Sequence, residues 1–283
     1  MAEIVIKDLT YVYGKGTPYE MKALDNVTVT FKDNMITGLI GHTGSGKSTL
    51  VQMLNGLLRP DSGEVFLDGK NIWDEPKEIS KVRFKVGLVM QYPEYQLFDE
   101  TVRRDIAFGP GNMGMKPDEI EKAVEEAARF AGLKPHLLEK SPFDLSGGQK
   151  RRAALAGVIA MHPEVLVLDE PAAGLDPGAR REILQRIRDY QRESGKSVII
   201  VSHSMEDMAM YCDRVVVMAN GAPVIEGTPA EVFSRAEELY SVGLDVPEVT
   251  KVARALRDCG VDIGLDIYTV KFAASRLPGV IEQ

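Results

Sequence analysis

The stretch Gly41-His42-Thr43-Gly44-Ser45-Gly46-Lys47-Ser48 decides how the rest of this chain is interpreted. It matches the pattern G-x-x-x-x-G-K-[ST] in full. It follows a short apolar run at residues 36–40 and precedes an apolar segment, 49–58, that we expect to be helical. Backbone N–H groups of such a loop converge on phosphate oxygens, and the positive end of the following helix adds to the attraction. The sequence therefore predicts a phosphate-binding loop in an α/β fold.

Two side chains of this loop carry chemistry beyond that of the backbone. Lys47 can reach the β- and γ-phosphates of a nucleotide, and the Ser48 hydroxyl can ligate Mg²⁺. A glycine-rich turn that matches by chance is the alternative, and the flanking strand and helix patterns argue against it. We expect nucleotide contacts from Gly41, His42, Thr43, Gly44, Ser45, Gly46, Lys47, Ser48 and Thr49.

A second chemical signal lies at the end of another buried strand pattern, residues 165–168. Asp169 and Glu170 follow it directly. Asp169 can hold Mg²⁺ directly or through water, whereas Glu170 points elsewhere and can polarise an attacking water. Two acids at a strand end, taken alone, are more often simply solvated. The phosphate loop upstream favours the catalytic interpretation.

A third signal, Leu145-Ser146-Gly147-Gly148-Gln149, reads as a second glycine-bearing helix start. It offers a hydroxyl and free N–H groups to a phosphate. In order with the phosphate loop and the acidic pair, it resembles the signature of ATP-binding cassette (ABC) ATPases. The resemblance covers about residues 3–235. It implies an α/β fold: a P-loop NTPase (RecA-like) core with an antiparallel β subdomain, an inserted α-helical subdomain and a short C-terminal extension.

The same resemblance assigns roles to other positions. Gln91 is similar to the glutamine that senses Mg²⁺ and the attacking water, which makes Ser48, Gln91 and Asp169 the implied magnesium ligands. His203 resembles the switch histidine on the γ-phosphate, although a lone histidine is otherwise more often structural. The D-loop of the family is matched by Gly174, Leu175 and Asp176.

Two positions match the family pattern less specifically. Tyr13 stands where the family has an aromatic residue that stacks on adenine, but Tyr11 and Tyr19 are close by and a strand tyrosine is commonly structural. Ala172 stands where the family more often has Thr or Ser. We expect this departure to have a small effect, because the acidic residues on both sides are kept.

Four segments narrow the resemblance to ATPases of energy-coupling factor (ECF) transporters, of the A-prime type. They are residues 91–98, 16–20, 108–110 and 202–207. Directly after Gln91, a groove that receives a partner helix is expected. On residue type alone, an ordinary loop is an equal alternative. The candidate groove residues are Tyr92, Pro93, Glu94 and Tyr95.

The family resemblance implies a working site shared by two chains. Two cassettes pack head to tail, and ATP with Mg²⁺ lies between the phosphate loop of one and Ser146 and Gly148 of the other. The implied partners are a second ABC ATPase, related or identical, a transmembrane coupling subunit and a small substrate-binding membrane subunit. The chain would be peripheral, at the cytoplasmic face of the cell membrane. The cargo would be a vitamin or a transition-metal ion.

Alternatives are another ABC importer or a soluble ABC ATPase of DNA repair or translation. Only 99 residues separate Lys47 from Ser146, too few for the long coiled coil of repair-type members, and translation-type members usually carry two cassettes. The net charge of −8 also disfavours nucleic acid as a partner.

Spacing also predicts structure outside the site. Val27, Val29 and Phe31 alternate with polar residues, as in a half-buried strand, and Asp68-Gly69 and Asn220-Gly221 are typical of hairpins.

Helices are expected after Pro117, from Gly147 and from Gly178. In the first of them, apolar residues recur at helical spacing, at positions 120, 124, 127, 128 and 131.

Composition and cysteine spacing limit the remaining possibilities. The longest apolar run, residues 153–161, is far shorter than the roughly 20 residues of a membrane-spanning helix. Cys212 and Cys259 lie outside any C-x-x-C pattern, and we expect two free thiols with buried side chains. The predicted domains are a nucleotide-binding domain, 1–236, with its helical insert at about 92–162, and an extension, 237–283, that is a candidate dimer contact.

Overall fold

The computed structural model describes residues 3–276. The N-terminal part forms an antiparallel sheet of order β2-β1-β4-β5. Val27, Val29 and Phe31 are buried in alternation with more exposed neighbours, as predicted for a half-buried strand. Asp68 and Gly69 adopt φ angles of 53° and 76°, which suit a type I′ turn and confirm the predicted hairpin. The strands are β1 (Ile4–Tyr13), β2 (Met21–Phe31), β4 (Ser62–Leu67) and β5 (Lys70–Asn71).

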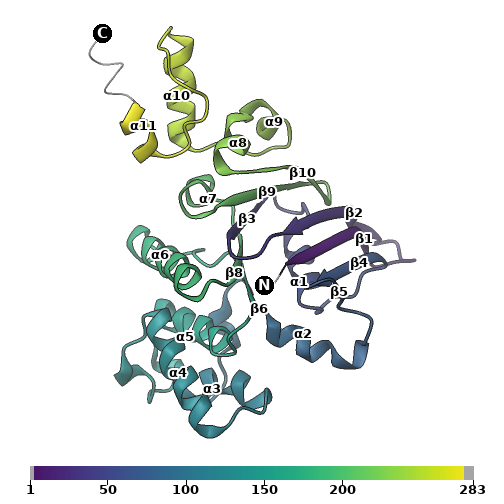
Figure 1. The fold of residues 1–283 in the computed structure, drawn as a ribbon, viewed down its shortest axis with the longest axis vertical. Coiled ribbons are helices and arrows are strands. Elements are labelled where there is room, and N and C mark those ends of the chain that lie inside the picture. The colour runs from purple at the N-terminus through teal and green to yellow at the C-terminus, as the bar shows by residue number, and fades with distance from the viewer. Residues whose placement is uncertain (1–2, 277–283) are drawn as a thin grey trace.

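A second, central sheet of order β10-β9-β3-β8-β7-β6 lies beside the first (Figure 1). Its neighbours are parallel except β10, which returns antiparallel to β9. β3, β7 and β8 are buried at every position, as their continuous apolar runs predict. The strands are β3 (Ile36–Ile40), β6 (Val86–Val89), β7 (Val165–Asp169), β8 (Ser197–Val201), β9 (Arg214–Ala219) and β10 (Ala222–Gly227).

This topology decides where the site lies. β8 separates β3 from β7, and all three run parallel. Their carboxyl ends therefore meet at one edge of the sheet, which is where ligands bind in open α/β folds. The phosphate loop follows β3, the acidic pair ends β7, and His203 follows β8.

Helices between β6 and β7 gather at one end of the molecule (Figure 1). α4 buries residues 123, 124, 127, 128 and 131, which confirms four of the five positions predicted from helical spacing, while the fifth, Ile120, is only partly buried. α3 was not predicted, because Gly109, Pro110 and Gly111 weaken its helical pattern. The elements are η2 (Pro93–Gln96), α3 (Val102–Asn112), α4 (Pro117–Ala131), η3 (Pro135–Leu137), η4 (Pro142–Asp144) and α5 (Gly147–Ile159).

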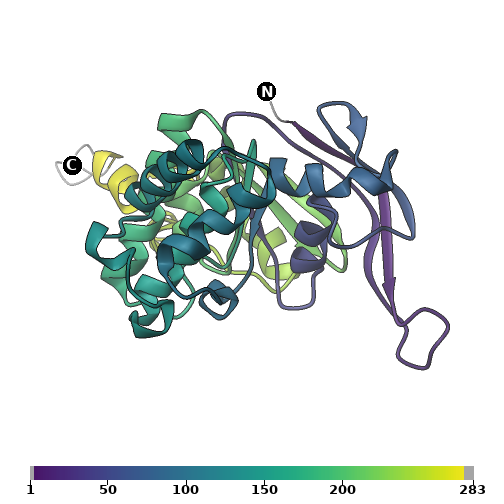
Figure 2. The same ribbon diagram turned by 90° about the horizontal axis from the view of Figure 1, so that it is seen from below.

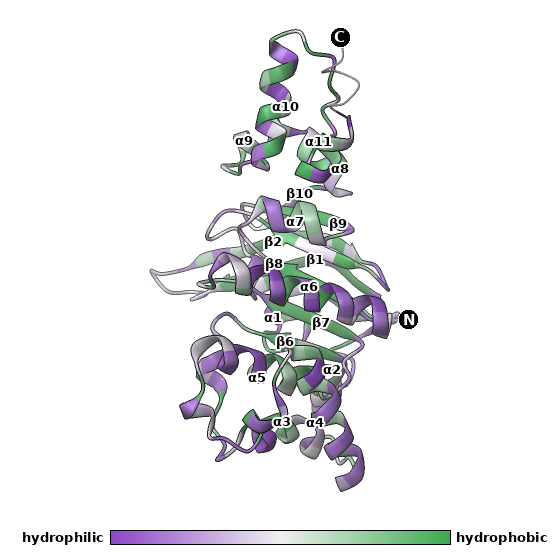
Figure 3. Cartoon of the chain, turned by 90° about the vertical axis from the view of Figure 1, so that its left-hand side faces the viewer, coloured by the Kyte–Doolittle hydropathy of each residue, from purple (hydrophilic) through white to green (hydrophobic). Residues whose placement is uncertain are grey.

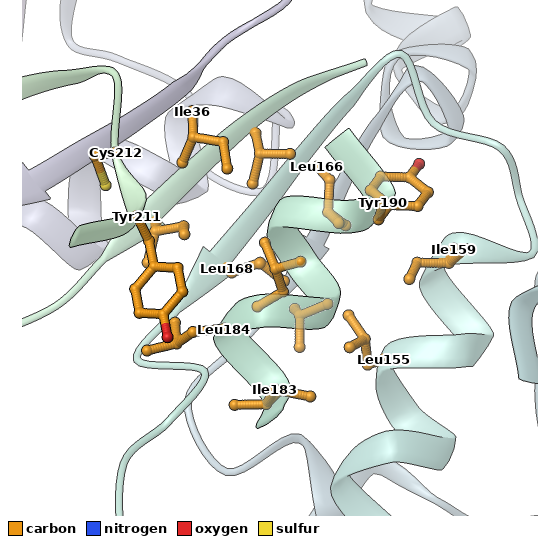
Figure 4. Packing of buried hydrophobic residues seen from close by; sticks show 14 of the residues in the cluster. Ile36, Leu155, Ile159, Leu166, Leu168, Ile183, Leu184, Tyr190, Tyr211 and Cys212 are labelled. Carbon is orange, nitrogen blue, oxygen red and sulfur yellow. The ribbon is translucent and has the colours of Figure 1, made fainter. Parts of the chain in front are cut away.

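The two faces of the central sheet carry separate buried clusters. One face packs with α1 (Lys47–Leu54) and the antiparallel sheet. On the other, Ile183 and Leu184 of α6 (Pro177–Ser194) belong to one buried cluster with Leu168 of β7 and Leu155 of α5 (Figure 4). Figure 2 shows the same layers from below. The remaining helices before β9 are η1 (Pro76–Glu78), α2 (Ile79–Lys85) and α7 (Met205–Tyr211).

α1 is displaced from its predicted range of 49–58. It begins at Lys47, because the loop delivers the chain directly into the helix. It ends at Leu54, because Gly56 adopts a left-handed φ of 68° and cannot continue a helix. α5 and α6, predicted from Gly147 and from Gly178, begin at Gly147 and Pro177.

The C-terminal part comprises α8 (Pro229–Ser234), α9 (Ala236–Ser241), α10 (Glu248–Asp258) and α11 (Val270–Arg276). α10 and α11 stand apart from the sheets (Figure 3). They share a small apolar cluster of Ala253, Ile263, Ile267 and Ala273. Positions 277–283 of the predicted extension lie outside the described residues. Across residues 3–276, no helix combines the length and apolar character needed to cross a membrane.

The two cysteines are free, as predicted, but they differ in burial. Cys212 is buried, as expected. Cys259 is exposed, so the expectation of a buried side chain was wrong there. It caps α10 one residue past Asp258, beyond the buried positions Thr250 and Ala253 of that helix.

Candidate functional site

The phosphate loop between β3 and α1 has little room for larger residues. A Cβ atom at Gly46 would come within 2.5 Å of the Ala23 carbonyl oxygen, and its φ of 96° is strained for any other residue. A Cβ at Gly41 would come within 2.3 Å of the Met218 carbonyl oxygen. Glycine at these two positions is therefore required by the packing of the loop against neighbouring backbone.

Lys47 lies at the start of α1 with its side chain folded back over the loop. Its Nζ donates to the carbonyl oxygens of Gly41 at 2.7 Å and His42 at 2.9 Å. Burial lowers the pKa of the Lys47 ammonium, and the nearby carboxylates of Glu170 and Asp169 oppose that shift. The ammonium is thus held among oxygen atoms, at a position where a phosphate would be a better partner.

Asp169 ends β7 beside the start of α1. Its carboxylate is buried and faces the same cavity as Ser48. Burial raises the pKa of Asp169, while Ser48 and Lys47 act in the opposite direction. The structure therefore brings together two of the three predicted magnesium ligands, a hydroxyl at the start of α1 and a carboxylate at the end of β7. Such oxygen ligands suit Mg²⁺, whose remaining positions are usually taken by water and substrate phosphates.

Glu170 has two unusual features. Its backbone adopts a left-handed φ of 53°, which is rare for a residue with a Cβ and concentrates at functional sites. Its Oε1 is buried without a hydrogen-bond partner among the described residues, although His203 Nε2 lies 3.2 Å away. Burial first, and then the neighbouring Asp169, raises the pKa of Glu170 to about 7. A carboxylate with a free lone pair and this pKa is suited to orient or accept a proton from water.

His203, after β8, is half-exposed and completes this edge of the site. Burial and the Lys47 ammonium lower the pKa of the imidazole, while Asp169 raises it. The neutral ring can therefore accept or donate a hydrogen bond at ordinary pH.

These groups surround one cavity of 310 Å³. Tyr13 lines it, and its hydroxyl lies 3.3 Å from Thr49 Oγ1, whereas Tyr11 packs edge to face behind it. Predicted residues in the lining are Tyr13, Thr43, Gly44, Gly46, Lys47, Ser48, Thr49, Gln91, Asp169, Glu170 and His203. Gly41, His42 and Ser45 belong to the loop but do not line the cavity.

Sequence reasoning missed three lining residues, Met21, Ala23 and Val201. Met21 pairs with Tyr13 across the β1–β2 hairpin. This strand pairing could have predicted that Met21 lines the cavity with Tyr13, because residues opposite each other in an antiparallel pair share a face.

The predicted signature segment, residues 145–149, does not line this cavity. Ser146 caps α5: its Oγ accepts from Gln149 N at 3.4 Å, while Gln149 Oε1 accepts from Ser146 N at 3.0 Å. Leu145 is buried and anchors the segment. Ser146 is exposed, and open space surrounds Gly147 and Gly148. The segment therefore presents an uncovered helix start away from its own phosphate loop.

The predicted D-loop joins the acidic pair to α6. Gly174 adopts a φ of 71°, and Leu175 follows it, half-buried. Asp176 caps α6 by accepting from Gly178 N at 2.9 Å and Ala179 N at 3.0 Å. These bonds hold the pKa of Asp176 below its ordinary value.

The segment after Gln91 divides into exposed and internal residues. Tyr92 and Tyr95 are 46% and 85% exposed. Pro93 is buried, and Glu94 forms an ion pair with Arg151 inside the chain. Only the two tyrosines of the predicted groove are therefore freely available at the surface.

Comparison with known proteins agrees with this geometry. Residues 24–173 match the ABC transporter family. The chain is 51% identical to the energy-coupling factor transporter ATP-binding protein EcfA2 of Clostridium acetobutylicum, with 99% of this chain and 98% of that protein covered. It is equally 51% identical to EcfA2 of Clostridioides difficile, with 98% and 97% covered.

Solved structures give the same result. CbiO1 of Clostridium perfringens, described as part of the ABC transporter complex cbiONQ, has a TM-score of 0.75 at 39% identity, covering 90% of this chain and 98% of that one. The cassette MJ0796, a dimer bound to ADP and Pi, has a TM-score of 0.73 at 28% identity, covering 80% and 98%.

The chain therefore belongs to the ABC transporter family, with the P-loop α/β fold expected of an ATP-binding cassette. Within that family it is an ATP-binding subunit of the energy-coupling factor type, whose reaction is ATP hydrolysis coupled to transport.

Proposed function

We propose that this chain hydrolyses ATP at a composite site, built from its own phosphate loop and the signature segment of a second ATPase subunit. One observation carries the proposal. Lys47, Asp169, Glu170 and His203 converge on a single cavity, while the capped and uncovered start of α5 lies outside it. A complete site needs both halves, so a head-to-tail pair of cassettes is the arrangement that supplies them.

Within the cavity we assign roles from geometry. Lys47 would exchange its bonds to loop carbonyls for bonds to the β- and γ-phosphates. Glu170 would orient the attacking water through its free Oε1, and His203 would contact the γ-phosphate. Tyr13 would stack on adenine at the β1 end of the cavity.

The residues present fit a magnesium ion. Its three predicted ligands, Ser48, Gln91 and Asp169, line the same cavity. Among residues 3–276 no group of three or more His, Cys, Asp or Glu side chains gathers at a metal-binding spacing, so the protein supplies few ligands of its own. The ion would neutralise phosphate charge, and its remaining ligands would be water and nucleotide.

For the partner groove, Tyr92 and Tyr95 support a docking surface for a membrane coupling subunit. The chain runs on from them into a cavity of 290 Å³, where Phe98 and Phe108 pack edge to face. Charge reversal at Glu94 is a poor test, because it breaks the ion pair with Arg151. Tyr95→Glu is cleaner. It should prevent assembly with the membrane partner and leave ATP binding intact; normal assembly would contradict the groove.

The C-terminal extension supports a contact with the second ATPase. Val252 and Val270 are 57% and 74% exposed beside the small cluster of α10 and α11. Val252→Glu should weaken association of the subunits in sedimentation experiments without changing the melting temperature. Unchanged association would remove this contact from the proposal.

The proposed assembly contains a second ATPase, a transmembrane coupling subunit and a small substrate-binding membrane subunit, with this chain peripheral at the cytoplasmic face. The proposed cargo is a vitamin or a transition-metal ion. Gentle detergent extraction, with this subunit as the handle, tests the assembly. An ordinary permease pair in its place would indicate another importer class.

Site variants test the chemistry. Glu170→Gln should bind ATP, hydrolyse it about a hundredfold or more slowly, and trap the closed dimer. Lys47→Ala should lose ATP affinity. Normal turnover in the first variant, or unchanged binding in the second, would refute the assigned roles.

A further inference from the structure

Arg151 lies on the buried side of α5, two residues beyond the signature segment. Its side chain is 7% exposed, and that of Glu94 is 17% exposed. Arg151 Nη2 lies 2.9 Å from Glu94 Oε1, and its Nε donates to Glu94 Oε2 at 3.2 Å. The remaining guanidinium nitrogen, Nη1, donates to the carbonyl oxygen of Ala173. One side chain thus uses a two-point ion pair and a backbone bond at the same time.

The groups that Arg151 joins come from three separate parts of the site. Glu94 lies three residues after Gln91, within η2. Ala173 ends a turn that begins at Glu170, because its N–H donates to the Glu170 carbonyl oxygen at 3.1 Å. Arg151 itself belongs to the helix that Ser146 caps. The guanidinium therefore touches the segment after Gln91, the turn that begins at Glu170 and the signature helix.

The energetics of this arrangement favour a fixed geometry. A buried charge pair gains little net stability over apolar side chains of similar size, whereas removal of one partner leaves a costly unpaired charge. Two-point pairing of a guanidinium with a carboxylate also fixes direction, which an ammonium cannot do. The arginine is thus better explained by the orientation it imposes than by the stability it adds.

The neighbouring Arg152 offers an internal comparison. It also pairs with a carboxylate at two points, Glu182, and also donates to a backbone carbonyl, that of Gly132. Glu182 lies on α6 and Gly132 caps α4, so neither belongs to a segment assigned to ATP. The two arginines share a helix and a bonding pattern, and they differ in what they connect.

We infer that Arg151 is a positioning residue for ATP hydrolysis, which holds the Gln91 segment and the Glu170 turn in register with the signature helix. It touches no part of the nucleotide cavity, so it acts through these segments. The inference rests on the proposed function, since it requires the roles given there to Gln91, Glu170 and the signature segment.

The test compares variants of the full-length chain in its assembled transporter. The set is Arg151→Met, Arg151→Lys, Glu94→Gln and the matched control Arg152→Met, with Lys47→Ala as a check on the site itself. Measured quantities are the dissociation constant for ATP, kcat for hydrolysis and the melting temperature. Arg151→Met should lower kcat about tenfold or more, because small misplacements of reacting groups are costly. Its ATP affinity should stay within about twofold, because the phosphate loop is untouched.

The remaining variants separate positioning from stability. Arg151→Lys keeps the positive charge but cannot pair with the carboxylate at two points. Its kcat should lie between those of wild type and Arg151→Met. Glu94→Gln keeps the size of the side chain, so it should reproduce the loss of kcat even if Arg151→Met does not fold. Arg152→Met should keep kcat within about twofold. It should lose less melting temperature than Arg151→Met, because the ion pair of Arg152 with Glu182 is more exposed than that of Arg151 with Glu94.

Two outcomes would overturn the inference alone. One is equal loss of kcat in Arg151→Met and Arg152→Met, with each variant assayed well below its own melting temperature. The other is wild-type kcat in Glu94→Gln. If Lys47→Ala hydrolyses ATP at the wild-type rate, the proposed function is wrong and the inference is overturned with it.

Discussion

Replacement of Glu170 by glutamine should make the folded chain more stable above neutral pH while it slows ATP hydrolysis strongly. The Glu170 carboxylate is only 13% exposed, and its Oε1 has no hydrogen-bond partner among the described residues. Glutamine has nearly the same shape and carries no charge. The substitution therefore removes an unfavourable buried charge and leaves the surrounding packing in place.

The size of the effect follows from the pKa. Burial, followed by the charge of Asp169, raises the pKa of Glu170 from its ordinary value of 4.5 to about 7. Each pKa unit corresponds to about 1.4 kcal/mol, so ionised Glu170 costs the folded state about 3 kcal/mol. Because the folded pKa is the higher one, this cost is absent below pH 4.5 and grows as the pH rises to about 7. The advantage of the glutamine variant should follow the same course.

Thermal unfolding in EDTA and without nucleotide measures this difference. At pH 8 the variant should melt several degrees above wild type, since about 1 kcal/mol shifts the melting temperature of large domains by roughly 2–4 °C. At pH 4.5 the two should coincide. Glu182→Gln is the opposite control, because Arg152 and Arg186 lower the pKa of that carboxyl. Equal melting temperatures at pH 8, or a gap that does not change with pH, would refute the reasoning.

Further predictions concern the loop, the helix cap and the thiols. Gly46→Ala should cost at least about 2 kcal/mol of stability and abolish ATP binding, because its Cβ would meet the Ala23 carbonyl oxygen; calorimetry measures both. Ser146→Ala should lose about 1 kcal/mol by removing the cap of α5, seen in denaturant unfolding, and should lower ATPase activity. A thiol reagent should modify Cys259 rapidly and Cys212 only after unfolding, because burial raises the pKa of the Cys212 thiol.

Many of the helices, strands and turns could be predicted from residues that are close together in the sequence. The strand that precedes the phosphate loop, the Asp-Gly and Asn-Gly hairpins and the helix after Pro117 all depend on residues close in sequence. The glycine-rich loop around Gly46 and the acidic end of β7 could also be predicted, because each lies within a short segment of sequence. Their positions relative to one another follow from the rule that parallel strands end at one edge.

Contacts between distant segments could not be predicted in this way. Nothing in the spacing of Glu94 and Arg151 shows that they meet, because a long-range ion pair has no periodicity. Pro93 is buried in η2, which packs against α5 from far along the chain. The helix over Val102–Asn112 was hidden because Gly109 and Pro110 have poor helical propensity, which packing against α4 and α5 overrides.

The place of β3 in the central sheet has a consequence for biosynthesis. Ile36 pairs with Val198, and Thr37 pairs with Arg214. The strands that β3 pairs with are therefore synthesised roughly 160 residues or more after it. The antiparallel sheet, by contrast, is complete once residue 71 has emerged. A nascent chain must therefore shield an apolar strand until β8 and β9 appear. ATP can act as a folding ligand only for a chain whose synthesis has passed β9.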